Sequence, residues 1–314
     1  METASELKPF ARTLSVPGVA SRLFFYDSAA RPDEAKRSAG QARVDRAGQA
    51  PTTVILIHGL GDEADTWRHV FPILAKNRRV VAPDLPGFGR SVALGRPNLE
   101  RHAKAVRALL PETGKAILVG NSLGGAIAEL VAFREPDRVA ALALIDGGLP
   151  SGGKLSIGLL ASLVPGVIER GYRAWRDNHE GAYGSLDPYY ASLASLSAQD
   201  RDFLRARVVE RVESETQCRA YGASFRNYLR TAIFRSASYA RRLAAFQAPL
   251  LVVWGERDRI IPLSAREPLL TLRPDAQTET VPECGHLPHQ ERPDETADIL
   301  GRFFAEIDQA STGV

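Results

Sequence analysis

The chain is predicted to fold as an α/β protein, with a mostly parallel central sheet, helices on both faces and one inserted all-helical segment. Short apolar runs rich in β-branched residues alternate with segments whose apolar residues recur at helical spacing. Such runs are typical of strands buried on both faces, and their alternation with helices is typical of βαβ units. One long stretch after the middle of the chain breaks the alternation and shows helical spacing alone.

The composition is that of an ordinary globular protein. The 314 residues are 44% hydrophobic and 25% charged, and no stretch approaches the ~20 consecutive apolar residues that would cross a bilayer. Two cysteines, Cys218 and Cys284, are too few for a disulfide framework, and the charged N-terminal segment does not resemble a signal peptide. We therefore expect a cytoplasmic protein with no stable membrane insertion.

The predicted elements follow one another in βα order. Two N-terminal segments, 10–16 and 21–26, are expected to form an antiparallel hairpin at the sheet edge. The predicted buried strands cover 54–57, 79–82, 116–119, 139–145, 249–254 and 278–281. The predicted helices of the α/β part cover 63–76, 99–110, 123–134 and 293–307.

The stretch 149–245 is predicted to be a helical insertion between two strands of one core. The core then consists of 1–148 and 246–314, which makes it discontinuous in sequence. The insertion holds 14 Lys+Arg and 9 Asp+Glu, so the small positive charge of the whole chain, +3, belongs to it. A charge of this size is weak support for nucleic-acid binding, which we do not expect. Residues 31–50 are expected to be an exposed, flexible loop.

Gly120-Asn121-Ser122-Leu123-Gly124 is a G-x-S-x-G motif placed between a predicted strand and a predicted helix. Glycines on both sides of a serine allow a sharp strand-to-helix turn that presents the hydroxyl above the carboxyl end of the sheet. The N-terminus of the following helix would supply N–H donors where an oxyanion could form. The motif therefore indicates nucleophilic chemistry on Ser122.

A serine hydroxyl needs a base, and the base needs an orienting carboxylate. His286 lies in the loop after the last predicted strand, and Asp258 follows the strand before it. Because the loops at the carboxyl ends of parallel strands converge on one rim, Ser122, Asp258 and His286 can meet although they are far apart in sequence. Asp84 and Asp146 also end strands, so they are alternative carboxylates.

Several motifs together resemble the α/β-hydrolase superfamily. The turn at His58-Gly59 resembles its oxyanion loop, Asp84-Leu85-Pro86-Gly87-Phe88-Gly89-Arg90-Ser91 its D-x-P-G-x-G-x-S turn, and Gly285-His286 its histidine loop. The G-x-S-x-G motif matches its nucleophile elbow, and the order Ser, Asp, His along the chain is the family order. The resemblance implies an α/β-hydrolase fold with an inserted helical cap over the site.

The resemblance also implies roles for individual residues. Ser122 would be the nucleophile, His286 the general base and then acid, and Asp258 the carboxylate that orients it, with Asp146 as the rival acid. In this family a histidine at the position of His58 supports the oxyanion loop, and Asp84 is expected to fix its own turn.

The oxyanion hole is expected from two backbone N–H groups. These belong to Leu60 and Leu123, with His58 and Gly59 supporting the loop. Loss of one such donor typically costs ~3 kcal/mol in the barrier.

A serine at the elbow implies acyl chemistry on a carboxylic ester, thioester or lactone, without cofactor or metal. No G-x-G-x-x-G follows the first buried strand and no histidines or cysteines show metal-ligand spacing. Two alternatives stay open: a carbon–carbon bond hydrolase acting on a ring-cleavage diketo acid, and a catalytically silent ligand-binding relative. The expected partner is a small-molecule substrate, and homo-oligomerisation is left open.

The insertion contains many arginines, among them Arg226, Arg230 and Arg235. One interpretation is that they bind a substrate carboxylate bidentately, and the other is that they lie on solvated helix faces. We favour solvated faces.

Overall fold

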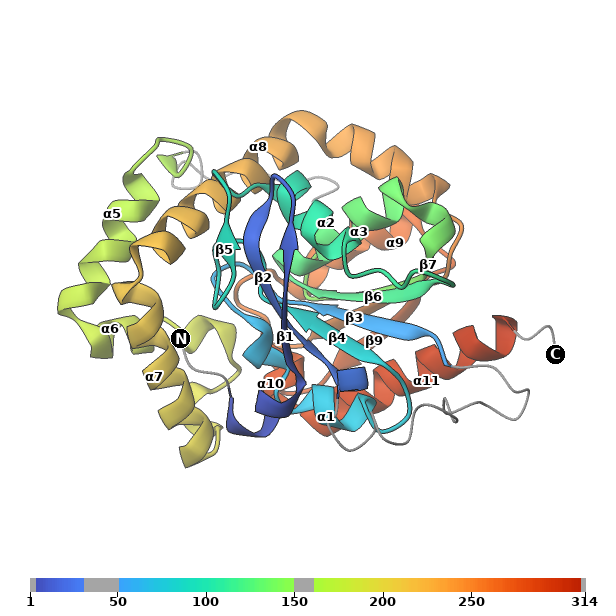
Figure 1. Cartoon of the computed structure of the whole chain (residues 1–314), viewed down its shortest axis with the longest axis horizontal. Coiled ribbons are helices and arrows are strands. Elements are labelled where there is room, and N and C mark those ends of the chain that lie inside the picture. The colour runs from blue at the N-terminus through green and yellow to red at the C-terminus, as the bar shows by residue number, and fades with distance from the viewer. Residues whose placement is uncertain (1–3, 31–50, 150–160, 312–314) are drawn as a thin grey trace.

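A computed structural model describes residues 4–30, 51–149 and 161–311 of the chain (Figure 1). Its centre is one sheet in the order β1-β2-β4-β3-β6-β7-β8-β9, with the two-residue strand β5 paired to β2. Strands β3, β4, β6, β7, β8 and β9 run parallel, and β1 and β2 form an antiparallel hairpin at one edge. The strand bounds are Ala11–Val16, Ala20–Asp27, Thr53–Ile57, Val80–Pro83, Val92–Ala93, Ala116–Asn121, Val139–Ile145, Leu250–Gly255 and Gln277–Val281 for β1 to β9.

The predicted strands and the predicted hairpin are all present, with ends that move by one or two residues. Strand β5 was not predicted because two residues are too few to show a pattern of apolar and polar positions. The apolar runs that predicted β6, β7 and β8 are buried along nearly their whole length, as expected of strands covered on both faces.

Helices cover both faces of the sheet (Figure 1). Helices α2 (Leu99–Arg107) and α3 (Leu123–Arg134) pack together on one face, and α1 (Val70–Leu74) and α11 (Pro293–Ser311) pack together on the other. Each face has its own apolar cluster. Two short helices, α9 (Glu267–Leu272) and α10 (Pro288–Glu291), follow β8 and β9.

The single helix predicted over 63–76 is wrong in detail. A 3₁₀ turn at Ala64–Trp67 precedes α1, and the two are not continuous. The polar residues of the turn are drawn into the interior: Asp65 is fully buried and binds the Tyr26 hydroxyl and the Arg90 guanidinium. Pairing with buried groups from distant segments therefore decides the local backbone here.

Between β7 and β8 the described part of the chain, 161–245, is helical, as the sequence predicted. It contains α5 (Val167–Ala174), α6 (His179–Gly184), α7 (Ala198–Glu213) and the long α8 (Glu215–Ala245). We call residues 161–245 the helical insertion. Figure 1 shows α5, α6 and α7 beyond one end of the sheet, whereas α8 runs back over the face that carries α2 and α3. The division into a discontinuous core and a cap domain stays a prediction, and the loop predicted over 31–50 lies outside the described residues.

Candidate active site

Ser122 stands at the tip of the turn between β6 and α3. Its φ of 54° is in the left-handed region, which costs a non-glycine residue free energy and is often found where a side chain must be presented. The turn is tight: a Cβ on Gly124 would lie 2.2 Å from the Ile57 carbonyl oxygen, and one on Gly120 would lie 2.3 Å from the Gly124 backbone. The two glycines of the motif are therefore required by close backbone approach.

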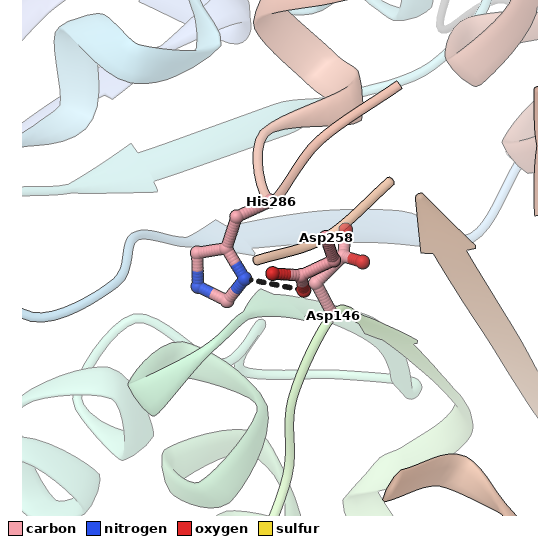
Figure 2. A group of neighbouring side chains, drawn as sticks. All are labelled: Asp146, Asp258 and His286. Atoms are coloured by element: carbon pink, nitrogen blue, oxygen red, sulfur yellow. Dashed lines mark hydrogen bonds and ion pairs between the residues drawn. The ribbon is translucent and has the colours of Figure 1, made fainter. Parts of the chain in front are cut away.

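His286 and Asp258 meet at the same rim. His286 Nδ1 lies 2.7 Å from Asp258 Oδ2, and both side chains are buried (Figure 2). Asp258 Oδ1 accepts the N–H groups of Ile260 and Ile261 at 2.8 and 2.9 Å, which fixes the carboxylate. Because the carboxylate accepts at Nδ1, that nitrogen carries the proton and Nε2 is left as the basic nitrogen.

The backbone of His286 is held from two sides. Its N–H donates to the Tyr189 carbonyl of the helical insertion at 2.8 Å, and its carbonyl accepts from Asn121 Nδ2 at 3.1 Å. Asn121 directly precedes Ser122, so this bond ties the histidine loop to the serine turn.

Asp146 is the third member of this cluster. One oxygen from each carboxylate and one ring nitrogen of His286 lie within 4.8 Å of one another, and Figure 2 shows the two carboxylates side by side. Asp146 Oδ1 accepts the Gly255 N–H at 2.7 Å. Burial, together with the charge of Asp258, raises the pKa of Asp146 well above its usual range. The His286 hydrogen bond goes to Asp258, and the carboxyl group of Asp146 lies beside this pair.

The loop after β3, residues 58–63, faces the serine turn, and we call it the β3 loop. His58 Nε2 accepts the Leu85 N–H at 2.8 Å, so Nδ1 carries the proton and donates to the Gly59 carbonyl at 2.7 Å. Burial lowers the pKa of His58, which keeps it in this neutral form. The Gly59–Leu60 peptide is trans, so its N–H points away from the carbonyl that His58 holds.

The two N–H groups expected to form an oxyanion hole, those of Leu60 and Leu123, meet no acceptor within the described part of the chain. Leu123 is the first residue of α3, so the partial positive charge of a helix N-terminus lies there as well.

A cavity of about 310 Å³ opens above these groups. Gly59, Leu60, Ser122 and His286 line its floor. Most of the wall comes from the helical insertion and is aromatic or aliphatic: Ile168, Tyr172, Trp175, Leu186, Tyr189, Tyr190, Leu204, Val208, Val212 and Tyr221. Asp62 and Arg211 also line the cavity, and they bind each other.

The arginines that the sequence analysis singled out lie away from this cavity. Arg226 forms a two-pronged pair with Glu169, at 2.8 and 2.5 Å. Arg230 and Arg235 are exposed and line a different groove, between α8 and the start of α2. Asp84, as expected, ties its own turn: its carboxylate accepts from the backbone and side chain of Arg90.

Two further histidines are buried. His102 of α2 is fully buried, its Nε2 lies 2.9 Å from Ser224 Oγ of α8, and burial lowers its pKa to about 3. His289 is buried beside Trp67 and bonded to Thr66, away from the reacting groups. Cys284 is buried, and burial raises its pKa, so it is a poor nucleophile.

Sequence reasoning missed the residues of the helical insertion that touch the site, above all Arg211, Gln217 and Tyr189. Arg207 and Arg211 stand one turn apart on α7, and this spacing was the one signal that could have suggested a shared set of carboxylate partners.

With the fold and the site geometry in place, comparison with known proteins assigns the class. A model of the alpha/beta hydrolase family matches residues 54–299, which is most of the chain. The chain belongs to this family, and the predicted α/β-hydrolase fold is confirmed.

Three relatives illustrate the range of activities. The chain is 32% identical, over 82% of its length, to a dihydrolipoyllysine-residue acetyltransferase component of an acetoin cleaving system from Pseudomonas putida, of which it spans only 64%. It is 31% identical, over 79% of its length and 96% of the relative, to a pimeloyl-[acyl-carrier protein] methyl ester esterase from Aromatoleum aromaticum. It is 30% identical, over 82% and 88%, to a 2-hydroxymuconate semialdehyde hydrolase from a Pseudomonas species.

Solved structures agree on the fold. A protein described as a putative lipase from Acinetobacter baumannii superposes with a TM-score of 0.72 at 20% identity, covering 96% of this chain and 92% of that one. A thermophilic esterase from Thermogutta terrifontis superposes with a TM-score of 0.71 at 21% identity, covering 95% and 99%. At these identities the likeness shows the fold alone. No helix in the described ranges is both long enough and apolar enough to span a bilayer.

Proposed function

We propose that the protein is a cofactor-free serine hydrolase that cleaves a small carboxylic ester, thioester or lactone through an acyl-enzyme on Ser122. The observation that carries the proposal is the 2.7 Å bond between His286 Nδ1 and Asp258, at the floor of the cavity that Ser122 also lines. A hydroxyl, an imidazole and a buried carboxylate in this arrangement are the parts that acyl transfer needs.

The steps follow from the positions of the groups. Ser122 Oγ attacks the carbonyl carbon while His286 Nε2 takes its proton. The oxyanion accepts the N–H groups of Leu60 and Leu123. His286 returns the proton to the leaving oxygen or sulfur, and a water molecule, activated by the same nitrogen, then releases the acid and restores Ser122. Asp258 holds the imidazole and stabilises its charged form.

The cavity favours an uncharged acyl group. Among the described residues that line it, the cation is Arg211, which is already bound to Asp62 and Glu63. A substrate carboxylate would have to compete with these two carboxylates. A volume of about 310 Å³ lies at the lower end of small-molecule pockets, so the substrate is compact.

The alternative of carbon–carbon bond cleavage is represented among the relatives by the 2-hydroxymuconate semialdehyde hydrolase. The lining of the cavity favours the ester over an anionic diketo acid, for the reason just given.

The test is covalent labelling with a fluorophosphonate probe, combined with assays on short p-nitrophenyl esters and on a vinylogous 1,5-diketo acid. We expect the wild type to label and to hydrolyse the esters faster than the diketo acid, and Ser122→Ala to do neither. Ser185→Ala is the matched control, because Ser185 lines the same cavity and its hydroxyl donates to the Ala182 carbonyl. Equal labelling of wild type and Ser122→Ala contradicts the catalytic proposal, and a clear preference for the diketo acid contradicts the substrate class.

A further inference from the structure

The β3 loop is anchored at both ends, and the two anchors come from different parts of the molecule. On the core side, His58 holds the Gly59 carbonyl. On the other side, residues 61–63 are held by the helical insertion, through three side chains at the junction of α7 and α8. We call Arg211, Gln217 and Tyr221 the α7–α8 corner.

Arg211 makes the strongest contacts of this corner. Its Nη2 binds Asp62 Oδ1, and its Nε donates to Glu63 Oε2 at 2.9 Å. Glu63 is fully buried, and the Arg211 side chain is only 13% exposed, so solvent screens these pairs little. A guanidinium that bridges two consecutive carboxylates fixes the backbone that carries them.

Gln217 and Tyr221 hold Gly61, the residue before Asp62. Gln217 Nε2 donates to the Gly61 carbonyl at 3.2 Å, and Gln217 Oε1 accepts the Gly89 N–H at 3.3 Å. The ring of Tyr221 lies against Gly61 so closely that a Cβ there would be 2.9 Å from two ring carbons. Gly61 has a φ of 77°, so this bend in the loop also depends on glycine.

Leu60, whose N–H is one of the two expected oxyanion donors, lies between these two anchors. We propose that Arg211 is a positioning residue of the oxyanion hole: the α7–α8 corner fixes the β3 loop so that the Leu60 N–H stays aimed at the carbonyl that Ser122 attacks. This inference rests on the proposed serine hydrolase function. It makes the helical insertion part of the catalytic apparatus as well as the wall of the cavity.

The consequence is kinetic. A donor that is displaced by about 1 Å stabilises the transition state less, whereas the aromatic and aliphatic side chains that form most of the cavity wall are unchanged. Arg211→Gln is therefore expected to lower kcat by about 10- to 100-fold, with KM changed by less than about threefold. Arg211→Lys, which keeps the charge but not the two-pronged contact, should fall between wild type and Arg211→Gln.

A second readout separates positioning from a general loss of structure. Sulfur is larger and a weaker hydrogen-bond acceptor than oxygen, so a well-formed oxyanion hole favours an oxoester over its thionoester. We expect the ratio of kcat/KM for the two esters to fall about tenfold in Arg211→Gln. Gln217→Leu, which removes no charge, should lower the same ratio by a smaller factor.

Arg173→Gln is the control. Arg173 is a half-exposed arginine of α5 that binds Glu215 at 2.6 Å and lies outside the cavity lining. It should leave kcat and the ratio unchanged.

The outcomes distinguish the two proposals. If the wild type neither labels with the fluorophosphonate nor hydrolyses esters, the proposed function fails. If the wild type is active and both Arg211→Gln and Gln217→Leu, folded by circular dichroism, keep the wild-type ratio of oxoester to thionoester, the positioning role is wrong. A lower kcat with an unchanged ratio in both variants also overturns it, because the hole would then be intact.

Discussion

The strand-end loops of the core and the helical insertion contribute to the site in different ways. The core supplies the three side chains that we propose to react: Ser122 follows β6, Asp258 follows β8 and His286 follows β9, and each is placed by the backbone at the end of a strand. The insertion supplies the apolar wall, the α7–α8 corner on the β3 loop and the Tyr189 carbonyl on the histidine loop. The chemistry therefore depends on backbone geometry in one region and on long side chains in the other.

The largest expected effect is in the core, at Asp258. Asp258→Asn keeps the shape of the side chain but cannot stabilise a charged imidazole and favours the wrong tautomer, so kcat/KM should fall by about 10³- to 10⁴-fold. Asp146→Asn should lose less than about tenfold, because Asn can still accept the Gly255 N–H and the hydrogen bond of His286 goes to Asp258. The measurement is ester hydrolysis by the two single variants.

The double variant Asp146→Asn, Asp258→Asn tests whether Asp146 can replace Asp258 as the carboxylate that supports His286. In Asp258→Asn the charge that raises the pKa of Asp146 is gone, so Asp146 ionises more readily and can support the imidazolium of His286. Asp146→Asn combined with Asp258→Asn should therefore be at least about tenfold less active than Asp258→Asn alone. Equal activity of the single and the double variant would show that only Asp258 is used.

The contrast between the two regions explains what could be predicted from sequence. The order of strands and helices, Ser122, His286 and the pairing of His286 with Asp258 all follow from features local to a strand end. The α7–α8 corner could not be predicted, because Arg211 pairs with carboxylates about 150 positions earlier in the chain and nothing in its own segment marks them. The insertion contains many other arginines with the same local pattern.

Burial of polar groups was the second feature that could not be predicted from the sequence. His102 shares a face of α2 with Leu99, Ala103 and Val106, yet the partner of its imidazole, Ser224, lies on α8, 122 positions later in the chain. A long helix that returns over the core can bury residues that its own sequence does not identify. For the same reason the break between Ala64–Trp67 and α1 became visible only with the partners of Asp65 in place.

A smaller effect, on stability, is expected where the two regions join. Glu129 of α3 is buried and accepts the N–H of Leu149, the last described residue before the insertion, at 2.6 Å, while its Oε1 meets no donor among the described residues. Burial raises the pKa of Glu129 from 4.5 to about 8. Between these values the native state binds more protons than the unfolded state, so stability is lost as pH rises from about 4.5 to about 8.

Glu129→Gln cannot ionise and can still accept the Leu149 N–H. We therefore expect it to be more stable than the wild type at pH 9, by about 1–3 kcal/mol, with the difference shrinking towards pH 5. Urea unfolding at pH 5, 7 and 9 measures this difference in the free energy of unfolding. Glu100→Gln, at an exposed position, is the control for removing a carboxylate. A stability difference that grows as pH falls would contradict the expected direction of the pH dependence. Glu129 would then not be neutral at pH 7.

The smallest expected effect is that of replacing Arg226, an arginine of the insertion that we compare with Arg211. Arg226, like Arg211, binds a carboxylate with two prongs, but its partner Glu169 belongs to the insertion itself. Arg226→Gln should lower the free energy of unfolding by about 1–2 kcal/mol, because the pair is largely shielded from solvent. It should leave kcat, KM and the ratio for an anionic against a neutral ester unchanged. A selective loss of activity on the anionic ester would instead place Arg226 in substrate binding, and would show that an arginine bound within the insertion also acts on the substrate.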